Sequence, residues 1–392
     1  MFASRTNWPL ETNRLTQALD EHRRSGRELL DLTESNPTEA GFAYPQQEIL
    51  SALADPRALV YRPQSKGLIE ARRAVAEYYA GRSGFSGSQR EIDPERILLA
   101  SGTSEAYSHI FRLLCEPGDE ILAPAPSYPL FEFLADLADI RLVPYPLLYD
   151  HGWQVDFLSL RAALTPRSRA VLVVHPNNPT GSLVKPREAA ELSELCASRD
   201  MAVVADEVFL DYTSGTSAPT FAFSDPALTF TLSGISKISL LPQMKLAWTI
   251  VSGPESLAQA AVERLEIIAD TYLSPGTPVQ LALSELLSVR HSLQPQVQRR
   301  ISANLSVLDS MLRVSKSLAR LERESGWYAI LKVPVTATDD ELAVALLEGH
   351  SVLVHPGHFF NFSREGFLVL SLITPEEKFQ EGVRRLREFF ER

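Results

Sequence analysis

Residues 169–174 (RAVLVV) and 202–205 (AVVA) are two short apolar runs, and each leads directly into polar residues. The first is followed by HPNNPTG at 175–181 and the second by Asp206-Glu207. Apolar runs of this length, rich in Val and bounded by turn-forming residues, are typical of strands buried on both faces of a parallel sheet. A segment with helical periodicity, near 186–198, separates them. This strand–helix–strand order predicts an α/β fold.

The alternation of strands and helices extends on both sides of this unit. Five further strand-like runs belong to the pattern: ILLA (97–100), EILA (120–123), IRLVPY (140–145), LTFTL (228–232) and AWTIV (247–251). We therefore expect a large domain over residues 46–268, built on a mostly parallel seven-stranded sheet with helices on both faces.

The pattern changes from about residue 269 onward. Two helical segments precede three strand-like runs, an order typical of an α+β unit. The first 45 residues hold one helix, near 13–25, and are too few for a core of their own. We expect residues 1–45 and 269–392 to form one smaller α+β domain, with the N-terminal segment packed on the C-terminal unit.

Composition excludes several classes of protein. The formal charge is −11, from 38 Lys+Arg and 49 Asp+Glu, which disfavours binding to nucleic acid or to an anionic membrane. The two cysteines are too few for a disulfide framework or a cysteine zinc site, and we expect no metal. The chain shows no apolar run of about 18 residues and no signal-peptide pattern, so we expect a cytoplasmic protein without a membrane segment.

Four of the expected strands end in unusual polar sequence. They run into SGTS (101–104), HPNNPTG (175–181), Asp206-Glu207 and SGISK (233–237). In an open parallel sheet, ligands bind beyond the carboxyl ends of the strands. If these strands are parallel, the four segments meet at one rim and form a candidate binding site.

Each segment alone has an ordinary structural explanation. A Ser/Gly/Thr turn commonly caps a helix, Asp206 fits a capping aspartate, and Lys237 fits a solvated surface lysine. Asn178 fits a plain strand-to-helix turn. Together, however, an amine, an acid, an amide donor and an anion cradle at a helix N-terminus describe a pyridoxal phosphate pocket. In such a pocket the acid keeps the pyridine nitrogen protonated, and the amine moves a proton between carbons.

The ordered motifs resemble those of class I/II aminotransferases, the fold-type I pyridoxal phosphate enzymes. The motifs are SGTSE (101–105), PSYPLF (126–131), HPNNPTG, ADEVF (205–209) and SGISK, and the resemblance extends from about Leu32 to the C-terminus. It implies that Lys237 forms a Schiff base with the cofactor and that Asp206 pairs with the pyridinium nitrogen. It also implies cofactor contacts from Gly102, Thr103 and Ser104 around the phosphate, from Ser236 and Lys245 nearby, from Asn178 to the ring oxygen and from Tyr128 stacked on the ring.

The resemblance also implies partners. Tyr61 matches the tyrosine that in this family reaches the phosphate of the neighbouring subunit, so a homodimer with shared active sites is expected. Asn36 lies in a segment similar to the one that closes over the substrate. The substrates implied are an amino acid and a 2-oxo acid.

Three positions depart from the family pattern. Lys245 stands where an arginine is usual, and Phe209 stands where a tyrosine is usual. Val369 replaces the arginine that clamps the substrate carboxylate. A carboxylate needs a cation, so we expect another residue to bind it, and the candidates are Arg364, Arg5 and Lys332.

The resemblance leaves three functions to be distinguished. The leading expectation is transamination through Lys237. The alternative is a lyase on the same fold, which cleaves a C–S bond or eliminates a β or γ group with the same cofactor. A non-catalytic sensor is the third, and retention of the lysine, aspartate and asparagine together argues against it.

Overall fold

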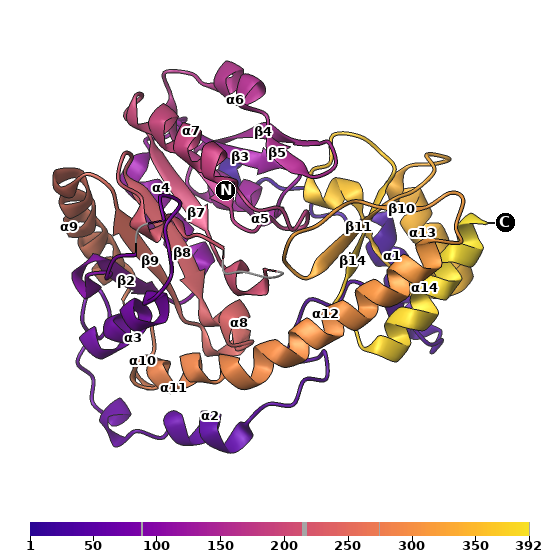
Figure 1. Cartoon of the computed structure of the whole chain (residues 1–392), viewed down its shortest axis with the longest axis horizontal. Helices are drawn as coiled ribbons and strands as arrows, with labels where there is room; N and C mark the ends of the chain where they lie inside the picture. Colours follow the sequence, from indigo (N-terminus) through magenta and orange to yellow (C-terminus); the bar gives the residue numbers. More distant parts are fainter. Residues whose placement is uncertain (88, 214–217, 274, 392) are drawn as a thin grey trace.

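The computed structural model describes residues 1–392 except 88, 214–217, 274 and 392. Two sheets dominate it and lie in neighbouring parts of the molecule (Figure 1). The strands are β1 Leu30–Asp31, β2 Ile97–Ala100, β3 Glu120–Ala125, β4 Arg141–Tyr149, β5 Trp153–Val155, β6 Ser168–Val174, β7 Ala202–Asp206, β8 Thr229–Gly234, β9 Ala247–Ser252, β10 Ala319–Arg320, β11 Tyr328–Lys332, β12 Val352–Leu353, β13 His355–Pro356 and β14 Phe367–Ser371.

The helices surround both sheets. They are α1 Arg14–Arg24, α2 Gln46–Ala52, α3 Ile69–Tyr79, α4 Thr103–Leu114, α5 Leu130–Leu137, α6 Phe157–Ala163, α7 Pro186–Ala197, α8 Ile235–Ile238, α9 Glu255–Tyr272, α10 Thr277–Leu281, α11 Leu283–Ser288, α12 Arg290–Leu312, α13 Asp339–His350 and α14 Glu376–Phe390. The long helix α12 lies above α2 in Figure 1 and slopes upward to the right, from α11 beside the large sheet to α14 beside the smaller one.

The large sheet has the strand order β2-β9-β8-β7-β6-β3-β4-β5. The neighbours from β8 to β4 are parallel, whereas β9 is antiparallel to both β8 and β2. Two successive antiparallel pairings leave β2 parallel to β8, so the polar segments after β2, β6, β7 and β8 share one rim. The mostly parallel α/β fold expected from the sequence is therefore confirmed.

The expected count of seven strands is corrected to eight. All seven expected runs form strands, and the additional strand is the edge strand β5, which pairs antiparallel with β4. Its three residues follow a tight turn in which the amide of Asp150 donates to the carbonyl of Gly152. Three residues are too few to show a strand period, so pairing with β4 rather than local sequence defines β5.

The central strands are buried on both faces. Alternate residues of β7 contribute to two separate cores: Ala202 and Val204 pack with residues of α4 and α9, whereas Val203 and Ala205 pack with residues of α7. Because successive side chains of a strand point to opposite faces, this explains why the run is continuously apolar.

The smaller sheet has the order β10-β11-β14-β13 and is antiparallel. Helix α1 packs on α13 and β1 pairs with β12, whereas Arg5 and Trp8 contact Asp139 and Asp136 at α5 of the large sheet. The proposed division at residues 45 and 268 stays a prediction, and residue 268 lies inside α9.

None of the helices in the described ranges is long and apolar enough to cross a lipid bilayer.

The turn from β9 into α9 predicts one stability effect. Gly253 has φ +120°, and a Cβ there would lie 2.6 Å from the carbonyl oxygen of Ala227. Gly253→Ala should therefore lower the free energy of unfolding by about 2–4 kcal/mol in denaturant titration. Gly349→Ala in α13 is the matched control, since no atom lies within 4 Å of its added Cβ, and it should keep or raise stability. Equal stability of the two variants would contradict this interpretation of the turn.

Candidate active site

The shared rim carries an acid and an amine at the ends of neighbouring strands. Asp206 ends β7, and Lys237 lies three residues after β8, in the short helix α8. The two side chains interact electrostatically: Lys237 lowers the pKa of Asp206, and Asp206 raises the pKa of Lys237. The central pair predicted from the sequence is thus brought together.

Asp206 is buried, and its carboxylate has two donors. The phenol of Tyr107 in α4 donates to Oδ2 at 2.9 Å, and the amide of Val208 donates to Oδ1 at 3.1 Å. Burial nevertheless raises the pKa of Asp206 to about 6, against the opposing effects of these donors and of Lys237. A cationic N–H beside this carboxylate would keep it ionised.

Lys237 lies among aromatic rings. Its Nζ is 4.8 Å from the ring centroid of Trp327 and 5.6 Å from that of Phe209. Burial by these neighbours lowers the pKa of Lys237 to about 8, although part of the side chain remains accessible to solvent. The hydroxyl of Tyr212 donates to the Lys237 carbonyl at 2.6 Å and fixes the backbone. A lysine of this pKa is a usable amine near neutral pH.

The loop after β6 supplies an unpaired amide. Asn177 is fully engaged: its Nδ2 donates to the carbonyl of Pro126 at 3.0 Å, and its Oδ1 accepts from Ser127 at 2.9 Å. The neighbouring Asn178 is also buried, but its Oδ1 has no hydrogen-bond partner. This oxygen is an acceptor, so the partner that it lacks is a hydrogen-bond donor.

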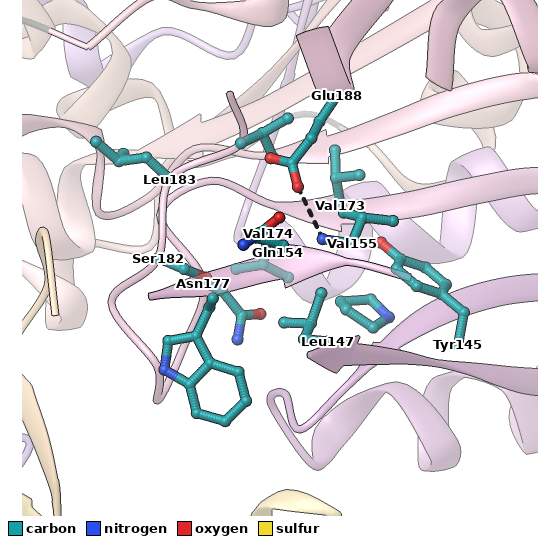
Figure 2. A pocket seen from close by; sticks show the side chains of 13 residues that line it. Tyr145, Leu147, Gln154, Val155, Val173, Val174, Asn177, Ser182, Leu183 and Glu188 are labelled. Carbon is teal, nitrogen blue, oxygen red and sulfur yellow. Dashed lines mark hydrogen bonds between the residues drawn. The ribbon is translucent and has the colours of Figure 1, made fainter. Parts of the chain in front are cut away.

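A small cavity lies directly behind this loop. Asn177 and Ser182 line it together with apolar residues such as Leu147 and Val173 (Figure 2). Figure 2 also shows Glu188 accepting from the amide of Val155, at 2.8 Å, which ties β5 to the first turn of α7. The cavity therefore lies between the loop at 177–183 and the edge strands β4 and β5.

The N-terminus of α4 opens onto the same rim. Gly102 is its N-cap, and no atom lies within 4 Å of the position that a Cβ would take there. Thr103 and Ser104 begin the helix and are partly or fully exposed. Free amides, the helix dipole and open space suit a phosphate.

The remaining predicted cofactor contacts lie around this rim. Ser236 is partly exposed beside Lys237, and Lys245 is exposed in a left-handed conformation just before β9. Tyr128 follows β3, is 42% exposed and interacts electrostatically with Asp206. It also lines a hollow of 760 Å³ that extends towards His358 and Phe362 of the smaller domain.

Three further predicted residues are exposed, and no contact in the described ranges joins them to Lys237 or Asp206. Tyr61 is 77% exposed on the segment after Pro56–Leu59. Asn36 is exposed, and its Oδ1 accepts from Thr38 of its own turn. Arg364 is exposed, with its guanidinium 5.6 Å from the ring centroid of Phe367.

The other two candidates for the carboxylate anchor also show no contact with Lys237 in the described ranges. Arg5 pairs with Asp139 at the surface, and Lys332 is exposed at the end of β11.

Sequence reasoning missed two residues of the site. Tyr107 lies one helical turn after Thr103, so the helical period would have placed it beneath the rim. Trp327 comes from the smaller domain, and nothing in its local sequence indicates contact with Lys237.

Comparison with known proteins agrees with this geometry. Residues 27–386 match the family model described as aminotransferase class I and II. The chain is 30% identical over 271 residues to the glutamate-pyruvate aminotransferase AlaA of Escherichia coli (strain K12), a match that covers 68% of this chain and 65% of the relative. It is 26% identical over 375 residues to the alanine aminotransferase of Mycobacterium bovis, covering 93% and 86% of the two chains.

Among solved structures, an alanine aminotransferase from Pyrococcus furiosus superposes with a TM-score of 0.89 over 100% of both chains, at 23% identity. At this identity the likeness shows the fold alone. Since the family model covers nearly the whole sequence, the chain belongs to the class I and II aminotransferases, a family that depends on pyridoxal phosphate.

Proposed function

We propose that the protein is a pyridoxal phosphate-dependent aminotransferase that moves an amino group between an amino acid and a 2-oxo acid. The observation that carries the proposal is the facing pair of Lys237 and Asp206 at one rim of the sheet. Family membership supports it, and the relatives named above, both aminotransferases, do not favour the lyase alternative.

The residues present fit the cofactor. The side-chain NH2 of Asn178 would donate to its ring oxygen, and the open N-terminus of α4 at Gly102 is a site for its phosphate. Thr103, Ser104, Ser236 and Lys245 would add phosphate contacts, and Tyr128 would cover the ring. Pyridoxal phosphate, when bound, supplies an aldehyde that accepts the amino group and a ring that withdraws electrons from the amino acid.

The chain's own groups then have separate tasks. Asp206 holds a proton at the ring nitrogen, because a buried carboxylate stabilises a cation beside it. Lys237 Nζ takes up the α-proton of the amino acid and returns it, since burial brings its pKa to about 8. Trp327 and Phe209 exclude water from the amine.

We also propose a homodimer with shared active sites. The exposed run of Leu59, Val60 and Tyr61 supports it, because large apolar side chains that stand together at a surface commonly mark an interface. In this proposal Tyr61 reaches the cofactor phosphate of the other subunit, and Asn36 lies near the substrate. The cytoplasmic location expected from the sequence remains a proposal.

Transamination and elimination give different products. With glutamate and pyruvate, the substrates that the name of the Escherichia coli relative specifies, we expect alanine and 2-oxoglutarate to accumulate in equal amounts. Chromatography of the products checks this, with a panel of other amino donors for comparison. Release of ammonia without any acceptor would instead favour a lyase.

Replacement of the amine tests the catalytic role of Lys237. In Lys237→Ala we expect turnover to fall at least about 10³-fold, because both the attachment point and the proton carrier are lost. Borohydride reduction followed by peptide mass mapping should find the cofactor on the Lys237 peptide of the wild type and on no peptide of the variant. Lys316→Ala, at an exposed position, is the control. Attachment at another lysine would remove Lys237 from this role.

Asp206 and Glu207 allow a matched comparison of two adjacent buried acids. Asp206→Asn keeps the shape but removes the charge, so kcat should fall about 10²–10³-fold. Glu207 is bonded to Thr220 and to the amide of Phe221, away from Lys237, so Glu207→Gln should affect the melting temperature more than kcat. Steady-state kinetics and thermal melting measure both. Equal loss of kcat in the two variants would contradict the separate roles.

A further inference from the structure

A buried tyrosine of helix α4 faces the acid of the candidate site. The hydroxyl of Tyr107 donates to Asp206 Oδ2 at 2.9 Å, and Tyr107 is only 2% exposed. Its ring is packed against two others, with its centroid 5.3 Å from that of Phe131 and 5.9 Å from that of Phe111. Because the surroundings of a buried ring are close-packed, the hydroxyl is held in one direction, towards the carboxylate.

The chemistry of this hydrogen bond favours the ionised acid. Burial, and then the charge of Asp206, raise the pKa of Tyr107 well above that of a free phenol, so its hydroxyl stays protonated near neutral pH. A hydrogen bond donated to a carboxylate stabilises the charged form of that carboxylate. Burial raises the pKa of Asp206 to about 6, and the bond from Tyr107 opposes this increase.

The other groups around this carboxylate come from several elements. The amide of Val208 and the charge of Lys237 also favour the ionised form. Glu207 and Tyr128 are close enough for the carboxylate to raise the pKa of each. Among the described side chains, only Tyr107 donates a hydrogen bond to it. Loss of that hydroxyl would therefore leave the acid with a single donor, a backbone amide.

Helix α4 also provides the N-terminus that suits a phosphate. Tyr107 follows Thr103 by four residues, about one helical turn, so one rigid element carries both groups. The phosphate and the ring nitrogen belong to different positions of the same cofactor ring. The helix therefore fixes the acid intended for the ring nitrogen relative to the site intended for the phosphate.

We propose that Tyr107 is a positioning residue that holds the Asp206 carboxylate ionised and so keeps a proton on the ring nitrogen of pyridoxal phosphate. The inference rests on the proposed function. The proton has two places: on the ring nitrogen, beside a carboxylate, or on Asp206, beside a neutral pyridine. The total charge is the same in both. A donor on the carboxylate favours the first arrangement, in which the ring withdraws electrons more strongly.

The position of the proton can be measured at the ring nitrogen itself. Apoenzyme is loaded with pyridoxal phosphate that carries an isotopic label at this nitrogen, whose NMR shift differs strongly between the protonated and the neutral form. We expect a protonated nitrogen in the wild type at neutral pH. In Tyr107→Phe, which keeps the ring and removes the hydroxyl, the signal should move towards the neutral form.

A buried tyrosine elsewhere in the large domain is the matched control. The hydroxyl of Tyr145 donates to the carbonyl of Leu172, also at 2.9 Å, and Tyr145 is 1% exposed. No contact in the described ranges joins it to Asp206. Tyr145→Phe thus removes a comparable hydrogen bond without changing the acid, and we expect it to keep the wild-type signal.

A pair of cofactor forms gives a second readout that does not depend on activity. A deaza analogue, in which C–H replaces the ring nitrogen, keeps the aldehyde and the phosphate. The dissociation constants of both forms for the apoenzyme are measured by absorbance titration. The wild type should prefer pyridoxal phosphate about tenfold or more, because the carboxylate then faces a charged donor. Tyr107→Phe should reduce this preference about threefold to tenfold, and Tyr145→Phe should keep it.

The outcomes separate a role in positioning the acid from a purely structural role. A ring nitrogen that is equally protonated in Tyr107→Phe and the wild type overturns the inference, and so does a neutral nitrogen in the wild type. Equal weakening of both cofactor forms in Tyr107→Phe also overturns it, because the hydroxyl would then only support the fold.

A stronger donor keeps the inference testable if Tyr107→Phe does not fold. Wild-type protein in which fluorotyrosine replaces tyrosine carries a more acidic phenol, so its preference for pyridoxal phosphate over the deaza analogue should rise. An unchanged or lower preference overturns the inference. Failure of the proposed function would appear separately, as absence of alanine in the product assay.

Discussion

The site depends on keeping two opposite charges buried at the ends of adjacent strands. Burial of an isolated ion is costly, so Asp206 and Lys237 are each shifted towards the neutral form, and each is partly stabilised by the charge of the other. The strands that lead to them, β7 and β8, are buried along their whole length. The interior of the sheet therefore excludes water from one side of the pair. The other side faces the rim at the carboxyl ends of the strands.

Asp206 and Glu207 are consecutive acids that lie on opposite faces of the sheet and have different partners. Asp206 points to the α4 side and is bonded by Tyr107, whereas Glu207 points to the other side and is bonded by Thr220 and the amide of Phe221. Burial raises the pKa of Glu207 to about 7. Because successive side chains of a strand alternate between faces, one acid is available at the rim and its neighbour anchors the chain behind it.

Much of this arrangement was predictable from the sequence, for a physical reason. Strands buried on both faces must be continuously apolar, so they stand out, and the polar residues that follow them are then fixed to one rim by parallel topology. That reasoning found Lys237, Asp206 and Asn178. It did not find the edge strand β5, which is too short to show a period, or Trp327, whose contact with Lys237 joins segments far apart in the chain.

The same limit applies to the substrate carboxylate, because Val369 stands where the family places an arginine and no local pattern marks the residue that takes this role. Val369 pairs with Ile330 of β11 and His355 of β13, so its face of the smaller sheet is largely apolar. The smaller domain reaches the site by a loop instead: the amides of Glu324 and Ser325 donate to the carbonyl of Gly181, in the loop that carries Asn178. A Cβ on Gly181 would lie 2.2 Å from the carbonyl oxygen of Ser325, so this approach requires glycine. The contact joins segments that are about 140 residues apart, and for that reason no local sequence pattern indicates it.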